Sequence, residues 1–123
     1  MEDSNSLQKM VKDYVEAFEA RDLSRCLNFF HDDAELHFAT GRFSGKKAIE
    51  QWHNDRFKGG MRLVEIEDIE VKDDTVIMHA VVTSPKLKLV RIDNFRGTGT
   101  FVIDQDKFKE VKMGLRKGYR FHI

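Results

Sequence analysis

The chain has 123 residues, of which 21 are Lys or Arg and 21 are Asp or Glu, so its formal net charge at pH 7 is zero. This length fits one domain, residues 1–123, because splitting it would leave two pieces too small to bury a stable core. A neutral chain also lacks the overall field that favours nucleic acid or an anionic membrane, so we expect neither as a partner.

Cysteine content and hydropathy point to a cytoplasmic protein. The single Cys26 cannot form an internal disulfide, and no apolar run approaches the roughly 20 residues that a membrane span needs. The acidic start, Met-Glu-Asp-Ser-Asn, does not resemble a signal peptide. On its helix, Cys26 shares a face with apolar residues, which favours a buried small residue over a nucleophile.

The first part of the chain has the periodicity of short helices. Apolar residues from Leu7 to Phe18 recur at spacings of three and four, and those from Leu23 to Phe30 do the same. Asn5 is predicted to cap the first of these helices and Asp22 the second.

Residues 34–38 alternate between apolar and polar, which predicts a short strand followed by a turn at Thr40-Gly41. A third helix is then expected to carry Ile49, Trp52, His53 and Phe57 on one side. Ser44 is its predicted cap, and Gly59-Gly60 is expected to end it.

The remainder of the chain is predicted to be sheet, with turns at Asp73-Asp74 and at residues 104–106. A change in the parity of apolar residues between Ile66 and Ile69 indicates a bulge, which would bend the sheet. The expected strands are Leu63–Val71, Thr75–Thr83, Phe95–Ile103 and Lys107–Phe121. Helices followed by an antiparallel meander define an α+β fold with the helices on one face of the sheet.

An apolar pocket is expected where the helices meet the concave side of such a sheet. Ten of the 123 residues are Phe, and large rings around a bent sheet leave concave space. The alternative is that these rings simply fill the core. The candidate ligand-binding residues are Tyr14, Phe18, Phe30, Phe38, Trp52, Phe57, His79 and Phe101.

Three stretches of sequence carry a resemblance to a known superfamily. They are VKDYVEAF with the following ARDL, FFHDDAEL, and FSGKKAI. In this order and spacing the chain resembles the nuclear transport factor 2-like superfamily, most closely its SnoaL-like and ketosteroid-isomerase-like branches. The resemblance implies a curved antiparallel sheet that is wrapped by three N-terminal helices and forms a cone-shaped barrel with an apolar pocket. It implies no single function, because this fold hosts isomerases, cyclases, hydrolases and binding domains.

The resemblance also implies roles for particular residues. Tyr14 matches a tyrosine that donates to a developing oxyanion in ketosteroid isomerases, although a phenol that merely bonds to water or a backbone carbonyl is the alternative. Phe38 falls where that branch has its carboxylate base. The string Ile92-Asp93-Asn94-Phe95 resembles the motif that holds the second oxyanion donor, whereas the hairpin register places Gly99 there, and we favour Gly99.

Other polar residues are weaker candidates. His79 lies in an apolar strand and could act as an acid or base, or could be a hydrogen-bonded structural histidine. His31, Asp33 and His37 have metal-ligand side chains, but their predicted positions do not converge, so we expect no metal and no cofactor.

Two functional hypotheses follow. The first is a SnoaL-like protein whose pocket binds a small hydrophobic molecule, with isomerase, cyclase or hydrolase activity left open and Tyr14, His79 and Asp93 as catalytic candidates. The second is a non-catalytic binding or dimerisation module. A homodimer through the outer face of the sheet is expected in either case, because Val111, Met113 and Leu115 alternate along the last strand and the helices cover only one face.

Overall fold

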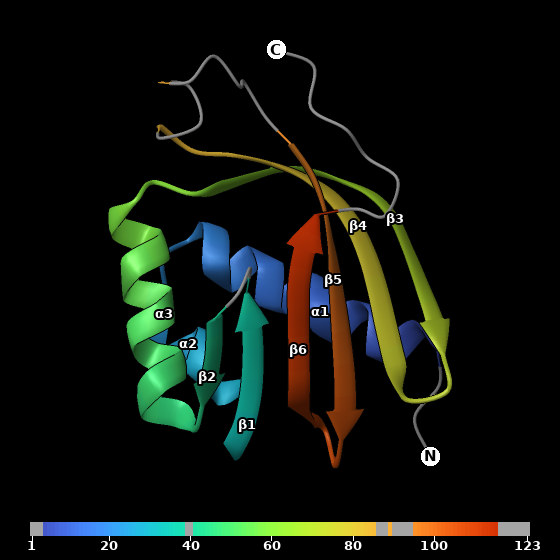
Figure 1. Ribbon diagram of the computed structural model, residues 1–123. Coiled ribbons are helices and arrows are strands. Elements are labelled where there is room, and N and C mark those ends of the chain that lie inside the picture. Colours follow the sequence, from blue (N-terminus) through green and yellow to red (C-terminus); the bar gives the residue numbers. More distant parts are fainter. Residues whose placement is uncertain (1–3, 39–40, 86–88, 90–94, 116–123) are drawn as a thin grey trace.

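The computed structural model describes residues 4–38, 41–85, 89 and 95–115. Helices α1 (Ser4–Glu19), α2 (Leu23–Asn28) and α3 (Lys46–Lys58) lie on one face of a curved sheet. Its strands are β1 (Phe30–Phe38), β2 (Gly41–Ser44), β3 (Arg62–Lys72), β4 (Thr75–Thr83), β5 (Phe95–Asp104) and β6 (Lys107–Leu115). The expected α+β architecture is confirmed (Figure 1).

The six strands follow the order β2-β1-β6-β5-β4-β3, with β2 and β3 at the two edges. The sheet is therefore not closed. The expected cone-shaped barrel is present as a curved sheet that is open between its edge strands, β2 and β3. Neighbouring strands are antiparallel except β1 and β6, which run parallel. A parallel pair needs a long crossover, and here α3 and the β3–β5 meander lie between the two strands.

Curvature comes from irregularities in the ladder. The β3–β4 register shifts between Leu63 and Glu65 and again between Ile66 and Asp68. The second shift is the bulge that the parity change predicts. Each bulge adds a residue on one strand and bends it, so β3 and β4 curl over the helices.

The helix termini confirm some caps and correct others. The Asp22 side chain accepts a hydrogen bond from the backbone N–H of Arg25, as predicted. Helix α1 already begins at Ser4, so Asn5 lies inside it. Gly45, at φ 86°, occupies the N-cap of α3 without a side-chain cap, so Ser44 does not have that role. Gly59 ends α3, as expected.

Two contacts fix the end of α1 against the α3–β3 connection. Glu19 accepts a 2.7 Å hydrogen bond from the backbone N–H of Leu63. Arg21 donates to the carbonyl of Met61 at 2.6 Å, and its guanidinium lies over the Phe57 ring. These contacts hold the start of β3 beside the helices and so position one wall of the cavity described below.

Candidate functional site

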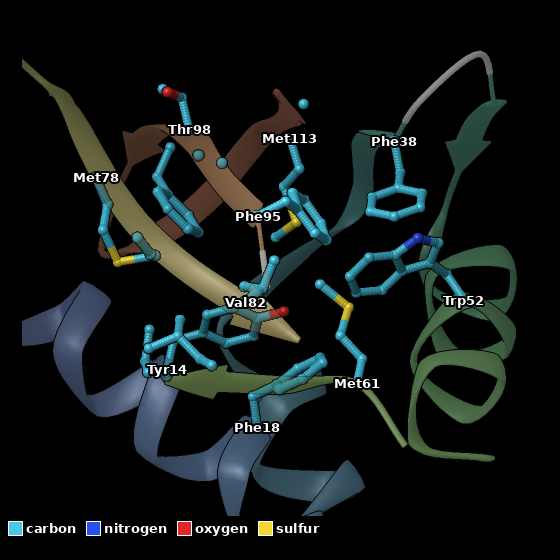
Figure 2. Close-up of a pocket in the computed structure, with 17 residues that line it drawn as sticks. Tyr14, Phe18, Phe38, Trp52, Met61, Met78, Val82, Phe95, Thr98 and Met113 are labelled. Atoms are coloured by element: carbon cyan, nitrogen blue, oxygen red, sulfur yellow. The ribbon is translucent and has the colours of Figure 1, made fainter. Parts of the chain in front are cut away.

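An apolar cavity of about 500 Å³ lies between α1, α3 and the concave face of the sheet (Figure 2). Its side chains are mainly aromatic rings, methionines and small residues. The lining consists of Tyr14, Val15, Phe18, Phe38, Trp52, Met61, Leu63, Met78, Ala80, Val82, Phe95, Gly97, Thr98, Gly99, Phe101, Met113 and Gly114.

The cavity exists because the middle of the inner face of β5, between Phe95 and Phe101, carries only the glycines Gly97 and Gly99. Gly99 pairs with Met78 on one side and with Met113 on the other. Gly97 pairs with Ala80 in the next inward-facing row. Residues without large side chains at the centre of a concave face leave space that the flanking side chains do not fill.

Phe38 and Trp52 form an aromatic wall at one side of the cavity. Their ring centroids lie 5.5 Å apart at an interplanar angle of 67°, the edge-to-face geometry that aromatic pairs prefer. The Arg56 guanidinium lies 4.8 Å from the Phe38 centroid. Among the described residues, the indole nitrogen of Trp52 has no hydrogen-bond partner, and it lies on the side of the ring that faces Phe38 (Figure 2).

The main polar feature of the site is a hydrogen bond between two buried side chains. Tyr14 Oη, from α1, lies 2.7 Å from His53 Nε2, from α3. Both residues are buried, with exposures of 2% and 0%. The other ring nitrogen, His53 Nδ1, lies 2.8 Å from the backbone carbonyl oxygen of Ile49. The Tyr14 hydroxyl points into the cavity in Figure 2, whereas His53 is not among the described residues that line it.

The surroundings of this pair favour neutral side chains. Burial raises the pKa of Tyr14 well above 10.0, with a smaller contribution from Cys26. Burial lowers the pKa of His53 to about 4, opposed in part by its hydrogen bond to Ile49. The rings of Phe18, Phe30 and Trp52 surround the imidazole. Removal from water disfavours the charged form of both groups, so proton transfer from Tyr14 to His53 is unfavourable.

The structure brings most of the predicted ligand-binding residues to the cavity. Tyr14, Phe18, Phe38, Trp52 and Phe101 are among the residues that line it. Phe30 and Phe57 instead pack behind it: the Phe30 ring lies 5.6 Å from Tyr14 and the Phe57 ring 5.1 Å from Phe18.

The remaining candidates lie elsewhere. Met78, Ala80 and Val82 line the cavity, so strand alternation turns His79 to the opposite face of the sheet. There its Nδ1 is 2.9 Å from Thr98 Oγ1. Asp93 falls outside the described residues, whereas Gly99, the position that the hairpin register favours, does line the cavity.

Sequence reasoning missed His53 as a site residue. The helical periodicity correctly predicts that His53 lies on the inner side of the third helix, but a histidine on the same face as Trp52 and Phe57 is typical of a core position. The available signal was its spacing: Ile49 lies four residues earlier, so the Ile49 carbonyl can hold one ring nitrogen and leave the other for a partner from another helix. No periodicity identifies that partner as Tyr14.

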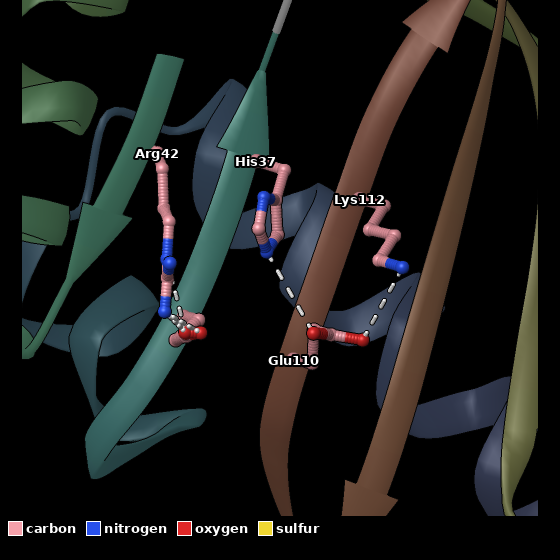
Figure 3. A network of polar contacts seen from close by, with 5 residues as sticks. His37, Arg42, Glu110 and Lys112 are labelled. Carbon is pink, nitrogen blue, oxygen red and sulfur yellow. Dashed lines mark hydrogen bonds and ion pairs between the residues drawn. The ribbon is translucent and has the colours of Figure 1, made fainter. Parts of the chain in front are cut away.

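A polar network occupies the opposite face of the sheet (Figure 3). Arg42 bonds both carboxylate oxygens of Glu35, at 2.6 and 2.9 Å. His37 and Lys112 lie 3.6 and 3.8 Å from oxygens of Glu110. Glu35, His37 and Glu110 place potential ligand atoms within 4.8 Å of one another, but Arg42 and Lys112 already neutralise both carboxylates. His31 is not part of the group, since it bonds the carbonyl of Asp104 at 2.6 Å.

The order of the elements and the cavity between helices and a curved sheet define a cystatin-like α+β protein. Residues 11–111 match the family model described as SnoaL-like domain. The chain therefore belongs to the SnoaL-like domain family, within the nuclear transport factor 2-like superfamily. No curated protein matches the chain significantly.

Solved structures share the fold at low sequence identity. The putative polyketide cyclase SMa1630 from Sinorhizobium meliloti is 20% identical, with 86% of this chain and 94% of that one covered, at a TM-score of 0.78. An uncharacterised cystatin fold protein from Novosphingobium aromaticivorans is 19% identical over 88% and 97%, at 0.73. TerC, co-crystallised with polyporic acid, is 15% identical over 89% and 91%, also at 0.73. Similarity at this level establishes the fold.

Within the part of the chain that the structure describes, no helix combines the length and apolar character that crossing a membrane requires.

Proposed function

We propose that this protein binds one small, mainly apolar, ring-containing molecule in the cavity between its helices and sheet. The observation that carries the proposal is the cavity itself. Its volume of about 500 Å³ lies within the roughly 300–1,000 Å³ range of ligand pockets, which are also mostly hydrophobic with a few polar groups. Aromatic walls such as Phe18, Phe38 and Trp52 suit flat rings.

Binding is supported better than any particular reaction. No Asp, Glu, His, Lys or Arg is among the described residues that line the cavity. General acid–base catalysis needs a titratable group within hydrogen-bond reach of the reacting atom, and Tyr14 is the one lining residue of that kind in the described set. Phe38 at the position of the family's carboxylate base agrees with a binding role. Isomerase, cyclase or hydrolase activity on an oxygen-bearing ligand is the alternative.

The similarity to SMa1630 and TerC supports the chemical class of the ligand. The first bears the name of a polyketide cyclase and the second was crystallised with polyporic acid. We extend only the general character of such molecules, oxygenated and ring-containing, to the ligand of this protein.

A thermal-shift screen with a steroid, an anthraquinone and a fatty acid tests the proposal. A ligand at a hundred times its Kd stabilises the folded state by about 2.7 kcal/mol, so a true ligand should raise Tm by several degrees. Trp52 is the only tryptophan in the chain and lines the cavity, so the same ligand should change the protein's fluorescence. If no ligand from these three classes changes Tm or the fluorescence, the non-catalytic dimerisation module is favoured instead.

The proposal includes a cytoplasmic location. Cys26 is a free thiol buried in the core, which agrees with a reducing compartment. Fractionation of cells that produce the tagged protein tests this part.

A further inference from the structure

We propose that the cavity selects ligands carrying a hydrogen-bond donor, a hydroxyl or N–H group, because Tyr14 Oη presents an acceptor and not a donor to the bound molecule. This inference rests on the proposed function and specifies the chemistry of its ligand. It reverses the role that the resemblance to ketosteroid isomerases assigns to this tyrosine.

The first step is the tautomer of His53. A backbone carbonyl can only accept a hydrogen bond, and the Ile49 oxygen lies 2.8 Å from Nδ1. Nδ1 must therefore carry a proton. His53 is fully buried, and its described hydrogen bonds go to a carbonyl and a phenol, with no carboxylate to balance a positive charge. A neutral imidazole has one N–H, so Nε2 is the unprotonated nitrogen.

The second step is the direction of the bond between the two side chains. Since Nε2 can only accept, the proton in the 2.7 Å contact belongs to Tyr14. A phenol has one proton and accepts through its remaining lone pairs. That proton is bonded to His53, which is not among the described residues that line the cavity. Only acceptor capacity therefore remains on the side of the hydroxyl that faces the cavity (Figure 2).

The third step concerns the other polar atoms of the lining. The Thr98 hydroxyl is within hydrogen-bond distance of His79 on the outer face, and the Trp52 nitrogen faces Phe38 (Figure 2). Neither points into the space beside Tyr14. Among the described lining residues, a ligand carbonyl placed against Tyr14 would meet a lone pair and find no donor, whereas a ligand hydroxyl would find a partner. Buried sites discriminate strongly against ligands that leave such groups unpaired.

Four tricyclic probes of similar size test this selection by calorimetric titration: fluorene, 2-methylfluorene, 2-hydroxyfluorene and 9-fluorenone. The hydroxyl and methyl probes are close in shape, so their ratio of affinities isolates the hydrogen bond. We expect wild type to bind 2-hydroxyfluorene about tenfold more tightly than 2-methylfluorene. In Tyr14→Phe that ratio should fall towards one.

A second variant tests the role of His53. Leu has nearly the volume of His but accepts no hydrogen bond. In His53→Leu the Tyr14 hydroxyl can therefore donate its hydrogen bond to a ligand. The affinity for 9-fluorenone relative to fluorene should then rise above its wild-type value. Loss of a core contact alone would weaken all four probes together. Thermal melts establish that each variant is folded, and if His53→Leu does not fold, the Tyr14→Phe comparison decides.

The possible failures are distinguishable. A hydroxyl preference that survives in Tyr14→Phe, or a wild-type preference for 9-fluorenone over fluorene that disappears in Tyr14→Phe, overturns the inference. Equal binding of all four probes overturns it and leaves the proposed function standing, whereas no binding of any probe, fluorene included, counts against both. Nitrogen NMR of histidine-labelled protein gives an independent readout: the Nδ1–H tautomer is expected for His53, and the Nε2–H tautomer would contradict the inference.

Discussion

Tyr14 and His53 are 39 residues apart in the chain, yet Tyr14 Oη lies 2.7 Å from His53 Nε2 inside the core. This bond connects α1 to α3 at the inner wall of the cavity, so it contributes both to stability and to the polarity of the site. The two contributions can be separated experimentally, because removing either side chain leaves the other with an unpaired buried group.

A double-mutant cycle measures the stability contribution. Tyr14→Phe leaves Nε2 of His53 without a partner, and an unsatisfied buried polar group costs about 1–3 kcal/mol of unfolding free energy. Adding His53→Leu removes that unpaired nitrogen, so the double variant should lose less than the sum of the two single losses. Urea denaturation of the four proteins provides the measurement. Strictly additive losses would show that the bond has no energetic role.

The buried His53 also predicts loss of stability in mild acid. Its pKa is lowered to about 4 in the folded protein, against 6.5 for an ordinary histidine. Between these values the unfolded chain binds more protons, so the free energy of unfolding falls as pH falls from about 6.5 to 4, by about 3 kcal/mol at most. Tyr14, which bonds the imidazole, and Cys26, which acts on Tyr14, stay neutral in this range because burial raises their pKa values, that of Cys26 to about 12.

Chemical denaturation at pH 7, 6, 5 and 4 checks this expectation. His53→Leu is the matched control, since it lacks the titrating group but retains the other histidines, and its stability should depend less on pH than that of wild type. Equal slopes for the two proteins would contradict the assignment of this pH dependence to His53.

The volume of the cavity can be altered from one position on β4. Ala80 lines the cavity, whereas Ile77 lies on the opposite face of the same strand. Ala80→Leu should fill part of the space and reduce ligand affinity at least tenfold, with little loss of stability because the added carbons enter a void. Ile77→Leu is the control and should bind normally. Affinity is measured by calorimetry with fluorene, and unchanged affinity in Ala80→Leu would place the ligand elsewhere.

Several features of the fold could be predicted from sequence because they depend on local patterns. The parity change near Ile66 predicts the bulge that curves the sheet. The nearly continuous apolar run of β4 does not show which residues face inward, so His79 was wrongly expected to line the cavity. The Tyr14–His53 bond depends on how two helices pack, which no local pattern specifies. The parallel pairing of β1 with β6 is likewise not specified by any local pattern, because the two strands are separated in the chain by α3 and the whole meander.

A homodimer through the outer face of the sheet stays a prediction. The apolar residues of the last strand no longer support it, and the charged residues of the outer face are its remaining basis. Val111 is fully buried and Met113 lines the cavity, so neither offers an apolar surface to a partner. The outer face instead carries ion pairs such as Arg42–Glu35 and Arg96–Glu67. An association through such a face should weaken with salt, because screening acts on exposed charges. Sedimentation velocity at micromolar concentration in low and high salt tests this, and a monomer in both would exclude the dimer.

The last prediction concerns catalysis. Wild-type protein should not isomerise a β,γ-unsaturated ketosteroid above background, because proton abstraction next to a carbonyl needs a base within hydrogen-bond reach. Phe38 occupies the position where the resemblance places that base, and its ring lies in the cavity wall beside Trp52. A positioned base contributes about a hundredfold to ten-thousandfold in rate. Tyr14, with its proton bonded to His53, could not remove the proton or polarise the ketone.

Phe38→Asp restores a carboxylate at this position and is the informative comparison. The Arg56 guanidinium, 4.8 Å from the Phe38 ring, would lie close to the new carboxylate, lower its pKa and weaken it as a base. The rate should therefore rise further when Arg56→Leu is added, and both variants must be shown to fold and to bind the steroid. Substantial turnover by wild type that Tyr14→Phe abolishes would contradict this account. It would show that another group acts as the base, with His53, the hydrogen-bond partner of Tyr14, the first to test.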